Sequence, residues 1–229
     1  RNLTSTYNLA FEGENTLETE QTYQVVLTNV KDNLAYVAPT GTYTLTGADD
    51  FIVFPYTWAA TNGDELVAAL DYDNSKTKTV IFKNDIEMSA NQSNAYGKTG
   101  INIMNGQTLD GAGHTFKVKN AGGTWDTAIS TTGGTIKNLT VAQGFRGIFV
   151  NHNSTHSEKV ILNNVVINGP TYTLNCDQGT YQGLEATNCT FNGWTSYAET
   201  IGEIKFNNCS FGKGAGYKTC VPYRPTTFT

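Results

Sequence analysis

Carboxylate side chains capable of acid–base catalysis are sparse in the second half of this 229-residue chain. A pair of carboxylates cleaves a glycosidic bond when one protonates the leaving oxygen and the other activates water. Asp177 and Glu199 form the best such pair, because their spacing fits neighbouring turns of a repeat. The other acidic residues of this region do not gather at one repeat position, so solvated surface charge is the simpler interpretation.

Two histidines, His152 and His156, stand four residues apart in the segment NHNSTHSE. On a helix this spacing would suit metal chelation, but the surrounding asparagine and serine residues indicate a loop. Loops often carry function, so both histidines are candidates for ligand binding. No cysteine or histidine spacing matches a zinc site, and we expect no metal.

Aromatic residues recur just before several short strand-like runs. They are Trp125, Phe145, Tyr172, Trp194 and Tyr217. Inside the fold such a column is core, whereas outside it offers flat apolar faces on which sugar rings stack. Trp125 and Trp194 have small and polar neighbours, which favours exposure and makes them the candidates for carbohydrate binding.

The elements that position these residues follow from an internal repeat. Four segments share an alternating apolar template that is interrupted by asparagine: GTIKNLTV, VILNNVVI, LEATNCTF and IKFNNCSF. Their asparagines are Asn138, Asn164, Asn188 and Asn208, which are separated by 26, 24 and 20 residues. A period of two predicts strands with one buried face. Asparagine tolerates the left-handed conformation and predicts a bend between two strands.

Looser copies, GAGHTF and VIFKNDIEM, extend the repeat toward the N-terminus, and a further strand-like run precedes most copies. Stacked coils of strands are the economical solution, which predicts a parallel β-helix. The asparagine column and the segment TLDGAGH, from Thr108 to His114, resemble the right-handed parallel β-helices of the pectate-lyase-like superfamily over roughly residues 60–229. The resemblance implies an inward ladder of asparagine side chains at Asn138, Asn164, Asn188 and Asn208.

The expected fold is therefore all-β, a right-handed single-stranded parallel β-helix of about six coils. Residues 1–57 lack the repeat and are predicted to form a small antiparallel β module, with the β-helix over 58–229. An amphipathic helix over 61–71 would cap the coils, which occupy about 78–221. No second cap is visible, so a short tail with Pro222 and Pro225, a partner chain or missing sequence is expected to cover the C-terminal end.

The four cysteines fit the same interpretation. Cys189 and Cys209 occupy the same inward slot in consecutive copies, and Cys176 and Cys220 fall two coils apart. Parallel side chains in register splay apart, so we expect free thiols rather than disulfides. Three of the ladder asparagines match the glycosylation sequon N-x-[ST], which we interpret as a by-product of the repeat, because a buried asparagine cannot carry a glycan.

Bulk composition excludes some classes of function. A net charge of −5 and a pI near 5.2 argue against nucleic-acid binding, which needs basic patches. A charged fraction of 15% suits an extracellular all-β protein. No apolar run reaches the length of a membrane span. The chain begins at Arg1 with no signal peptide, and we interpret it as a mature or trimmed chain.

Three functions follow from the resemblance. Family lyases use bound calcium with an arginine or lysine base, and family hydrolases use paired carboxylates; here Arg146 is the one arginine of the middle coils. The signatures of the hydrolases are absent. The first hypothesis is therefore a secreted or cell-surface bacterial protein, anchored or not, that binds a glycan or adheres without catalysis and without a cofactor. The alternatives are a polysaccharide lyase or glycoside hydrolase that uses Asp177 and Glu199, or Arg146 with calcium, and a structural segment of a surface or phage fibre.

Overall fold

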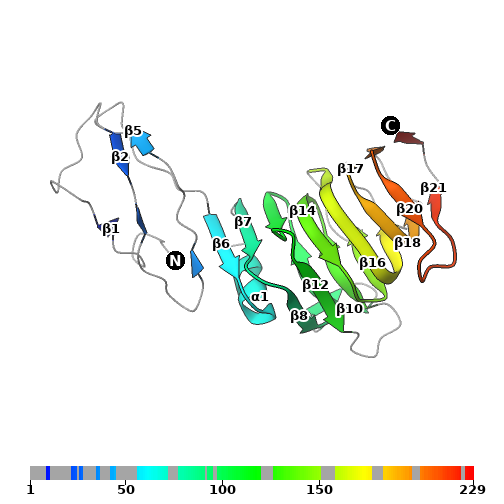
Figure 1. Ribbon diagram of the computed structural model, residues 1–229, viewed down its shortest axis with the longest axis horizontal. Helices are drawn as coiled ribbons and strands as arrows, with labels where there is room; N and C mark the ends of the chain where they lie inside the picture. The colour runs from blue at the N-terminus through cyan, green and yellow to red at the C-terminus, as the bar shows by residue number, and fades with distance from the viewer. Residues whose placement is uncertain are drawn as a thin grey trace.

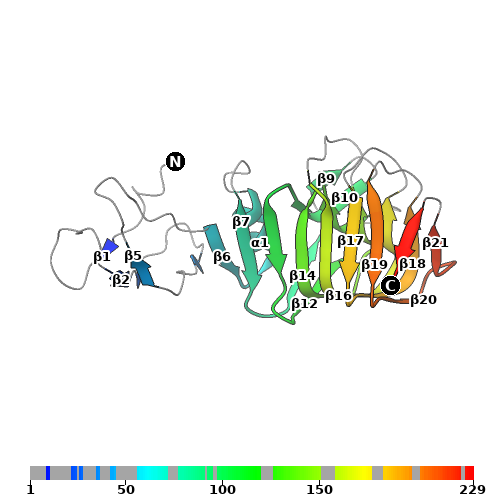
Figure 2. The same ribbon diagram turned by 90° about the horizontal axis from the view of Figure 1, so that it is seen from above.

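The computed structural model of the protein is a stack of strand coils (Figure 1). It describes residues 9–10, 22–24, 26–27, 35–36, 42–44, 56–71, 77–90, 92–94, 97–119, 126–150, 158–176, 183–197, 202–222 and 225–229. Successive coils follow one another along the long axis, from β6 and β7 at one end to β21 and the C-terminus at the other (Figures 1 and 2). The fold is the all-β parallel β-helix that the repeat predicts.

Three sheets make up the coils, and sheet 1 is the longest of them. The strands of sheet 1 that belong to the coils pair with one another in parallel. Its strands in spatial order are β6 (Tyr56–Ala60), β7 (Lys78–Phe82), β11 (Gln107–Asp110), the first half of β14 (Gly134–Val141), the first part of β16 (Val160–Cys176), β17 (Gly183–Thr187), β19 (Glu203–Asn207) and β22 (Thr226–Phe228). Figure 2 shows several of these strands side by side.

Sheets 2 and 3 hold six strands each in the described part of the chain, which agrees with about six coils. Sheet 2 consists of β8 (Ile86–Ser89), β12 (Thr115–Lys119), the later parts of β14 and β16, the start of β18 (Thr190–Tyr197), and β20 (Ser210–Gly212). Sheet 3 consists of β10 (Gly97–Ile103), β13 (Thr127–Thr131), β15 (Arg146–Val150), the ends of β16 and β18, and β21 (Cys220–Pro222). A short strand, β9 (Gln92–Asn94), pairs antiparallel with β10.

The strands before residue 56 form antiparallel pairs. They are β1 (Leu9–Ala10), β2 (Thr22–Gln24), β3 (Val26–Leu27), β4 (Ala35–Tyr36) and β5 (Thr42–Thr44). β1 pairs with β3, β2 pairs with β5, and β4 pairs with β6 of sheet 1. An antiparallel strand, β4, therefore pairs with the first strand of sheet 1. The domain boundary between residues 57 and 58 stays a prediction.

One short helix, α1 (Gly63–Asp71), covers the first end of the core (Figure 1). The Asn62 side chain accepts the Glu65 N–H at 2.9 Å, and the Glu65 carboxylate accepts the Thr61 N–H at 2.8 Å, which together satisfy backbone donors at the start of the helix. At the other end, the buried Lys78 ammonium donates to the carbonyls of Ala69 and Leu70. The helix follows β6, so it lies within the first turn rather than ahead of it.

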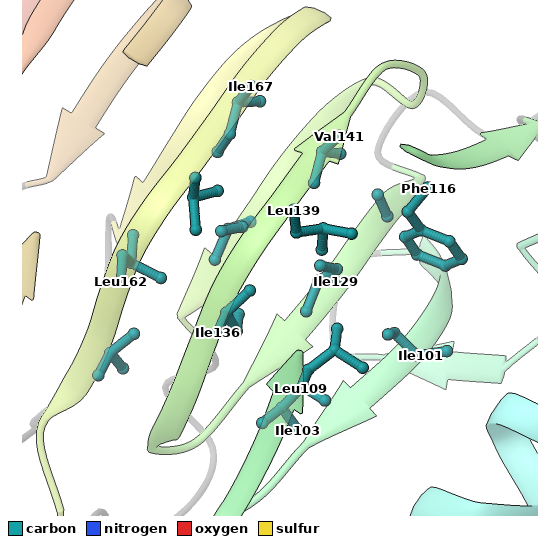
Figure 3. Packing of buried hydrophobic residues seen from close by; sticks show 14 of the residues in the cluster. Ile101, Ile103, Leu109, Phe116, Ile129, Ile136, Leu139, Val141, Leu162 and Ile167 are labelled. Atoms are coloured by element: carbon teal, nitrogen blue, oxygen red, sulfur yellow. The ribbon is translucent and has the colours of Figure 1, made fainter. Parts of the chain in front are cut away.

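The core consists of columns of apolar side chains that repeat from coil to coil. In sheet 1 the register aligns Val80, Leu109, Ile136 and Leu162, all fully buried. Phe116, Val141 and Ile167 form the matching column of sheet 2, and Ile101 and Ile129 belong to sheet 3. Figure 3 shows these side chains, apart from Val80, packed against one another. The strands β7, β11 and β12 bury alternate residues, as the period of two requires, whereas every residue of β13 and β15 in sheet 3 is buried.

The bends between sheets 1 and 2 are made by the repeated asparagines. Asn138, Asn164, Asn188 and Asn208 have φ values between 49° and 55°, in the left-handed region. The Asn164 amide donates to the Asn138 side-chain oxygen at 3.1 Å, and the Asn208 amide donates to that of Asn188 at 2.7 Å. The expectation that these side chains point inward is wrong, because three of them are exposed and Asn138 is half-buried.

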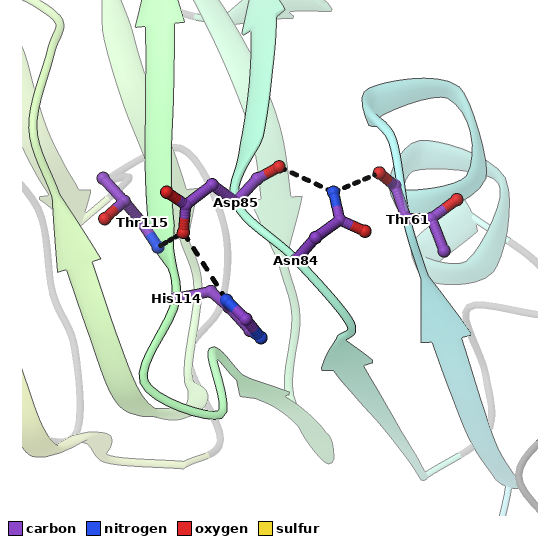
Figure 4. A network of polar contacts seen from close by, with 5 residues as sticks. All are labelled: Thr61, Asn84, Asp85, His114 and Thr115. Carbon is purple, nitrogen blue, oxygen red and sulfur yellow. Dashed lines mark hydrogen bonds and ion pairs between the residues drawn. The ribbon is translucent and has the colours of Figure 1, made fainter.

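The same bend in the first coils carries other polar groups (Figure 4). The Asn84 amide donates to the carbonyls of Thr61 and Asp85, both at 2.8 Å. The Asp85 carboxylate accepts the Thr115 N–H at 2.8 Å and lies 3.5 Å from Nδ1 of His114. This edge of the β-helix is therefore a solvent-facing line of hydrogen-bonding groups.

Asp110 accepts a hydrogen bond from the Asn138 amide at 3.1 Å, so the row of hydrogen-bonded side chains at the bend begins with an ionisable carboxyl. Burial raises the pKa of Asp110, but hydrogen bonds from the Ala112 N–H, the Asn138 amide and the Lys137 ammonium together hold it below its ordinary value of 3.8. A carboxyl whose folded-state pKa is lowered adds stability above its unfolded-state pKa, and this contribution disappears as pH falls through the folded-state value.

Replacement of Asp110 by asparagine is therefore expected to lower the free energy of unfolding by about 1 kcal/mol at neutral pH. The difference from the unmodified protein should shrink as the pH falls through the lowered pKa of Asp110, because both side chains are then neutral. Urea denaturation of the two proteins at neutral pH and at acidic pH measures it. A difference that stays constant between the two pH values would show that the charge of Asp110 contributes nothing.

The described cysteine side chains are free thiols, as expected for Cys189, Cys209 and Cys220. Burial raises the pKa of Cys189 to about 12, so this thiol stays protonated in the folded protein. The side chain of Cys176 lies outside the described residues, so its state stays a prediction.

The tail adds one more rung to sheet 1. β22 pairs with β19 in parallel, and the Phe228 ring stacks on Phe206 at a centroid distance of 5.5 Å. The tail therefore extends sheet 1 beyond β19, and coverage of the rest of this end by a partner chain or by missing sequence stays a prediction. Within the described part of the chain, no helix has the length and apolar character that crossing a membrane requires.

Candidate binding site at an aromatic corner

Five of the predicted site residues cannot be placed. Trp125, His152, His156, Asp177 and Glu199 lie outside the described residues. Their assignment to ligand binding or catalysis stays a prediction. Arg146 and Trp194 are the two candidates whose surroundings the structure describes.

Arg146 lies at the start of β15 and is only 5% exposed. Its guanidinium carbon is 4.7 Å from the centroid of the Phe149 ring, and its backbone N–H donates to the Asp126 carbonyl at 3.0 Å. A base in a polysaccharide lyase has to reach the sugar from a surface groove. The buried position of Arg146 does not favour that role, and its assignment as a base with calcium stays a prediction. Among the described residues, no three His, Cys, Asp or Glu side chains are grouped to hold a metal ion.

Trp194 belongs to a column of aromatic rings at the corner where sheet 3 begins. The Phe145 and Tyr172 centroids are 5.4 Å apart, and Tyr172 stacks on Trp194 at 4.7 Å with an interplanar angle of 22°. Tyr217 continues the column, with its centroid 6.1 Å from that of Trp194 and the two rings nearly perpendicular. The structure thus brings together four of the five aromatic residues that the sequence singles out.

The rings of this column differ in what they offer to a ligand. Tyr172 and Trp194 are half-buried, and each covers a face of the other. The indole nitrogen of Trp194 is buried as well. Tyr217 ends the column and is 71% exposed, which leaves its ring open to solvent. The residue best placed for sugar stacking is therefore Tyr217, with Trp194 as the ring that supports it.

Glycines allow the loop that carries Tyr217 to lie close against the preceding coil. A Cβ atom on Gly216 would be 2.4 Å from the backbone nitrogen of Trp194. Gly214 has a φ of 48°, and a Cβ atom there would be 2.2 Å from the Asn192 carbonyl oxygen. Both contacts require the absence of a side chain. Because Gly214 and Gly216 have no side chain, the loop can lie close against β18, and the Tyr217 ring is placed beside Trp194.

Two lysines accompany the exposed ring. Lys213 and Lys218 are exposed, and the Lys218 ammonium is 5.8 Å from the centroid of the Trp194 ring. The segment 210–222 holds no acidic residue, although the chain as a whole has a net charge of −5. Sequence reasoning missed Lys218; the signal that could have found it is the glycine-rich segment GKGAGYK, in which a lysine follows the tyrosine.

Comparison with known proteins agrees with this fold. The family model of a pectate lyase-like adhesive domain matches residues 57–165, from β6 into the middle of β16 (Figure 1). The chain is similar to pectate-lyase-like β-helices. No curated protein and no solved structure matches the chain. The aromatic corner is formed by Phe145, Tyr172, Trp194 and Tyr217. Phe145 lies within the matched residues and the other three rings lie beyond them, so the match covers only the first ring of the corner.

Proposed function

We propose that the protein is a non-catalytic adhesive module of a secreted or cell-surface bacterial protein, and that it binds a glycan through the aromatic corner. The similarity of residues 57–165 to an adhesive domain supports a surface role. The observation that carries glycan binding is the exposed ring of Tyr217, held at the end of an aromatic column.

The chemistry of the corner suits a sugar. The C–H face of a pyranose is apolar and packs on an aromatic face, while its hydroxyls stay free for hydrogen bonds. Lys218 follows Tyr217 in the chain, and its ammonium lies 5.8 Å from the centroid of the Trp194 ring, where it supplies a donor that can bond a hydroxyl or a carboxylate of the ligand. A supported ring loses little side-chain entropy on binding, which favours affinity from a small contact area.

The placement of Arg146 supports a binding role over a lyase role. A proton-abstracting base must lie within hydrogen-bond reach of the substrate, and Arg146 is buried beside Phe149. Asp177 and Glu199 remain the residues through which a hydrolase mechanism would act, and the test of the proposal has to include them.

One observation favours a structural role as the second candidate. Phe228 is 52% exposed at the C-terminal end of the stack, where Phe206 and Phe211 lie against it. Exposed apolar rings at the end of a strand stack suit end-to-end contact in a fibre. A fibre segment would self-associate at this end and would bind no glycan at the aromatic corner.

The test is a binding and turnover screen of the purified chain. Immobilised polygalacturonate, hyaluronate, xylan, mannan and mixed-linkage glucan would be presented with and without calcium. Retention of the protein is recorded together with the release of unsaturated or reducing ends. We expect retention on at least one polymer with no product.

Each other outcome points to one alternative. Product release that is lost in Asp177→Asn or Glu199→Gln would replace the proposal with a hydrolase, and calcium-dependent unsaturated product would replace it with a lyase. Failure to bind any polymer, combined with concentration-dependent self-association in analytical ultracentrifugation, would favour the fibre segment.

A further inference from the structure

The outer face of sheet 2 is hollowed near the C-terminal end of the stack. The shallow depression has a volume of about 290 Å³ and is lined by Val166, Asn168, Thr190, Asn192, Ser210, Phe211 and Gly212. Its lining comes from three consecutive rungs, β16, β18 and β20, which pair in parallel. Neither the similarity to the adhesive domain nor the aromatic corner assigns a role to this surface.

A short ladder of polar side chains crosses the depression. The Asn192 amide donates to the Asn168 side-chain oxygen at 2.8 Å, and the Ser210 hydroxyl donates to that of Thr190 at 3.1 Å. Both contacts join residues that face each other on adjacent rungs. Asn168 and Asn192 are 24 residues apart and Asn192 and Gly212 are 20 apart, which repeats the spacing of the last three bend asparagines.

The amide ladder ends where the next rung has no side chain. Gly212 pairs with Asn192 in the register of β18 and β20. A Cβ atom on Gly212 would lie 2.6 Å from the Asn192 side-chain oxygen. The Asn192 side-chain oxygen therefore lies against Gly212, in the place that a side chain at position 212 would occupy. In a ladder that continued, an amide on the next rung would donate to this oxygen. Among the described residues no side chain of that rung does so, and a ligand hydroxyl can take the role of the donor.

The lining indicates an uncharged ligand rich in hydroxyl groups. No charged side chain lines the depression, whose polar groups are amides and hydroxyls. Val166 is 37% exposed and contributes an apolar patch beside them. A sugar ring presents both an apolar C–H face and a rim of hydroxyl donors, which matches this mixture. An extended peptide would instead seek an unpaired strand edge.

The depression and the aromatic corner border the same loop. Gly212, in the depression, is followed by the segment 213–219 that carries Tyr217. Gly214 of that loop packs on the Asn192 carbonyl, and Gly216 packs on the Trp194 nitrogen. Asn192 and Trp194 stand two residues apart on β18. A chain of sugars that contacts the exposed ring has the depression as its neighbouring surface.

We propose that this depression is a second sugar subsite, in which the open Asn192 side-chain oxygen accepts a hydroxyl of a neutral sugar unit of the bound glycan. The inference rests on the proposed glycan-binding function and adds a position and a chemical class to it. Tyr217 stacks one unit, and the end of the amide ladder hydrogen-bonds another.

Two substitutions test the subsite without disturbing the core. Gly212→Ala places a methyl group against the flexible end of the Asn192 side chain and forces its oxygen to move, while the backbone there needs no positive φ. Asn192→Ala removes the acceptor itself. Asn163→Ala is the matched control, because Asn163 is a half-exposed asparagine on the outer face of sheet 1.

The probes are neutral hexasaccharides of β1,4-glucan, β1,4-mannan, β1,4-xylan and β1,3-glucan, with affinity measured by isothermal titration calorimetry. We expect Gly212→Ala and Asn192→Ala each to weaken binding of the best probe by about five- to tenfold, as the loss of a neutral hydrogen bond implies. Asn163→Ala should leave it unchanged. In the unmodified protein, the Asn192 side-chain amide resonance should shift as the probe is added.

The outcomes separate the subsite from the proposed function. Unchanged affinity in Gly212→Ala and Asn192→Ala, together with loss in Tyr217→Ala, would overturn the subsite and leave glycan binding in place. Absence of binding to every neutral and acidic glycan would overturn both. A shift of the Asn192 amide by an extended peptide but by no sugar would also overturn the subsite.

Discussion

Replacement of Phe191 by alanine is expected to lower the free energy of unfolding by about 3–5 kcal/mol, the cost of deleting a fully buried aromatic side chain. Phe191 lies at the centre of the aromatic part of the core. Its ring stacks on Phe211 at 5.4 Å and meets the edge of Phe206 at 5.7 Å, and its side chain has no exposed surface. Deletion would leave a cavity that rigid neighbouring rungs close poorly.

The register explains why the loss should be at the upper end of this range. In sheet 1, Ala186 stands between Leu162 and Phe206, so this coil contributes little volume from that side. Phe191, from the same coil, supplies the bulk in sheet 2. Because each coil contacts only its neighbours, the defect should loosen the coils that follow it more than those near α1.

Urea denaturation followed by circular dichroism measures the effect, and Phe228→Ala is its matched control. Phe228 belongs to the same group of rings but is half-exposed, so its removal should cost less than about 1.5 kcal/mol. Equal losses for the two variants would mean that the core does not depend on Phe191 for its packing.

The repeat was sufficient to predict the coils, because strand alternation that recurs every 20 to 26 residues leaves few other solutions. Asn138, Asn164, Asn188 and Asn208 were placed correctly at the bends. The inward direction of their side chains, which the resemblance implied, was wrong for a physical reason. A residue with positive φ turns the chain, so its side chain does not continue the alternation of the strand before it. The residue after each bend, such as Leu139, points inward, and the asparagine itself faces solvent.

The candidate site was only partly predictable. The recurrence of aromatic residues before sheet 3 indicated a column, and four of its members do contact one another. Which ring stays open depends on the end of the stack and on how Gly214 and Gly216 let a loop approach β18. The small and polar neighbours in the sequence favoured Trp125 and Trp194, but Trp194 is half-buried and stacks on Tyr172. The depression was missed because it is a gap in a ladder, which appears in the sequence only as glycine at an asparagine position.

Tyr217→Ala is expected to weaken glycan binding by at least about tenfold, since stacking on an aromatic ring contributes about 1–3 kcal/mol and tenfold corresponds to about 1.4 kcal/mol. The Tyr217 side chain is largely exposed, so its removal should leave the fold intact. Tyr217→Phe keeps the ring and should retain most of the affinity, which separates stacking from hydrogen bonding by the hydroxyl.

The control for this prediction is again an exposed ring at the same end of the molecule. Phe228→Ala removes an aromatic side chain outside the corner and should leave affinity unchanged. Affinity of each variant is measured by calorimetry with the polymer or oligosaccharide that the unmodified chain retains. If Tyr217→Ala binds as tightly as the unmodified chain while Phe228→Ala does not, the glycan contacts the open end of the β-helix, and the aromatic corner serves only to hold the last coils together.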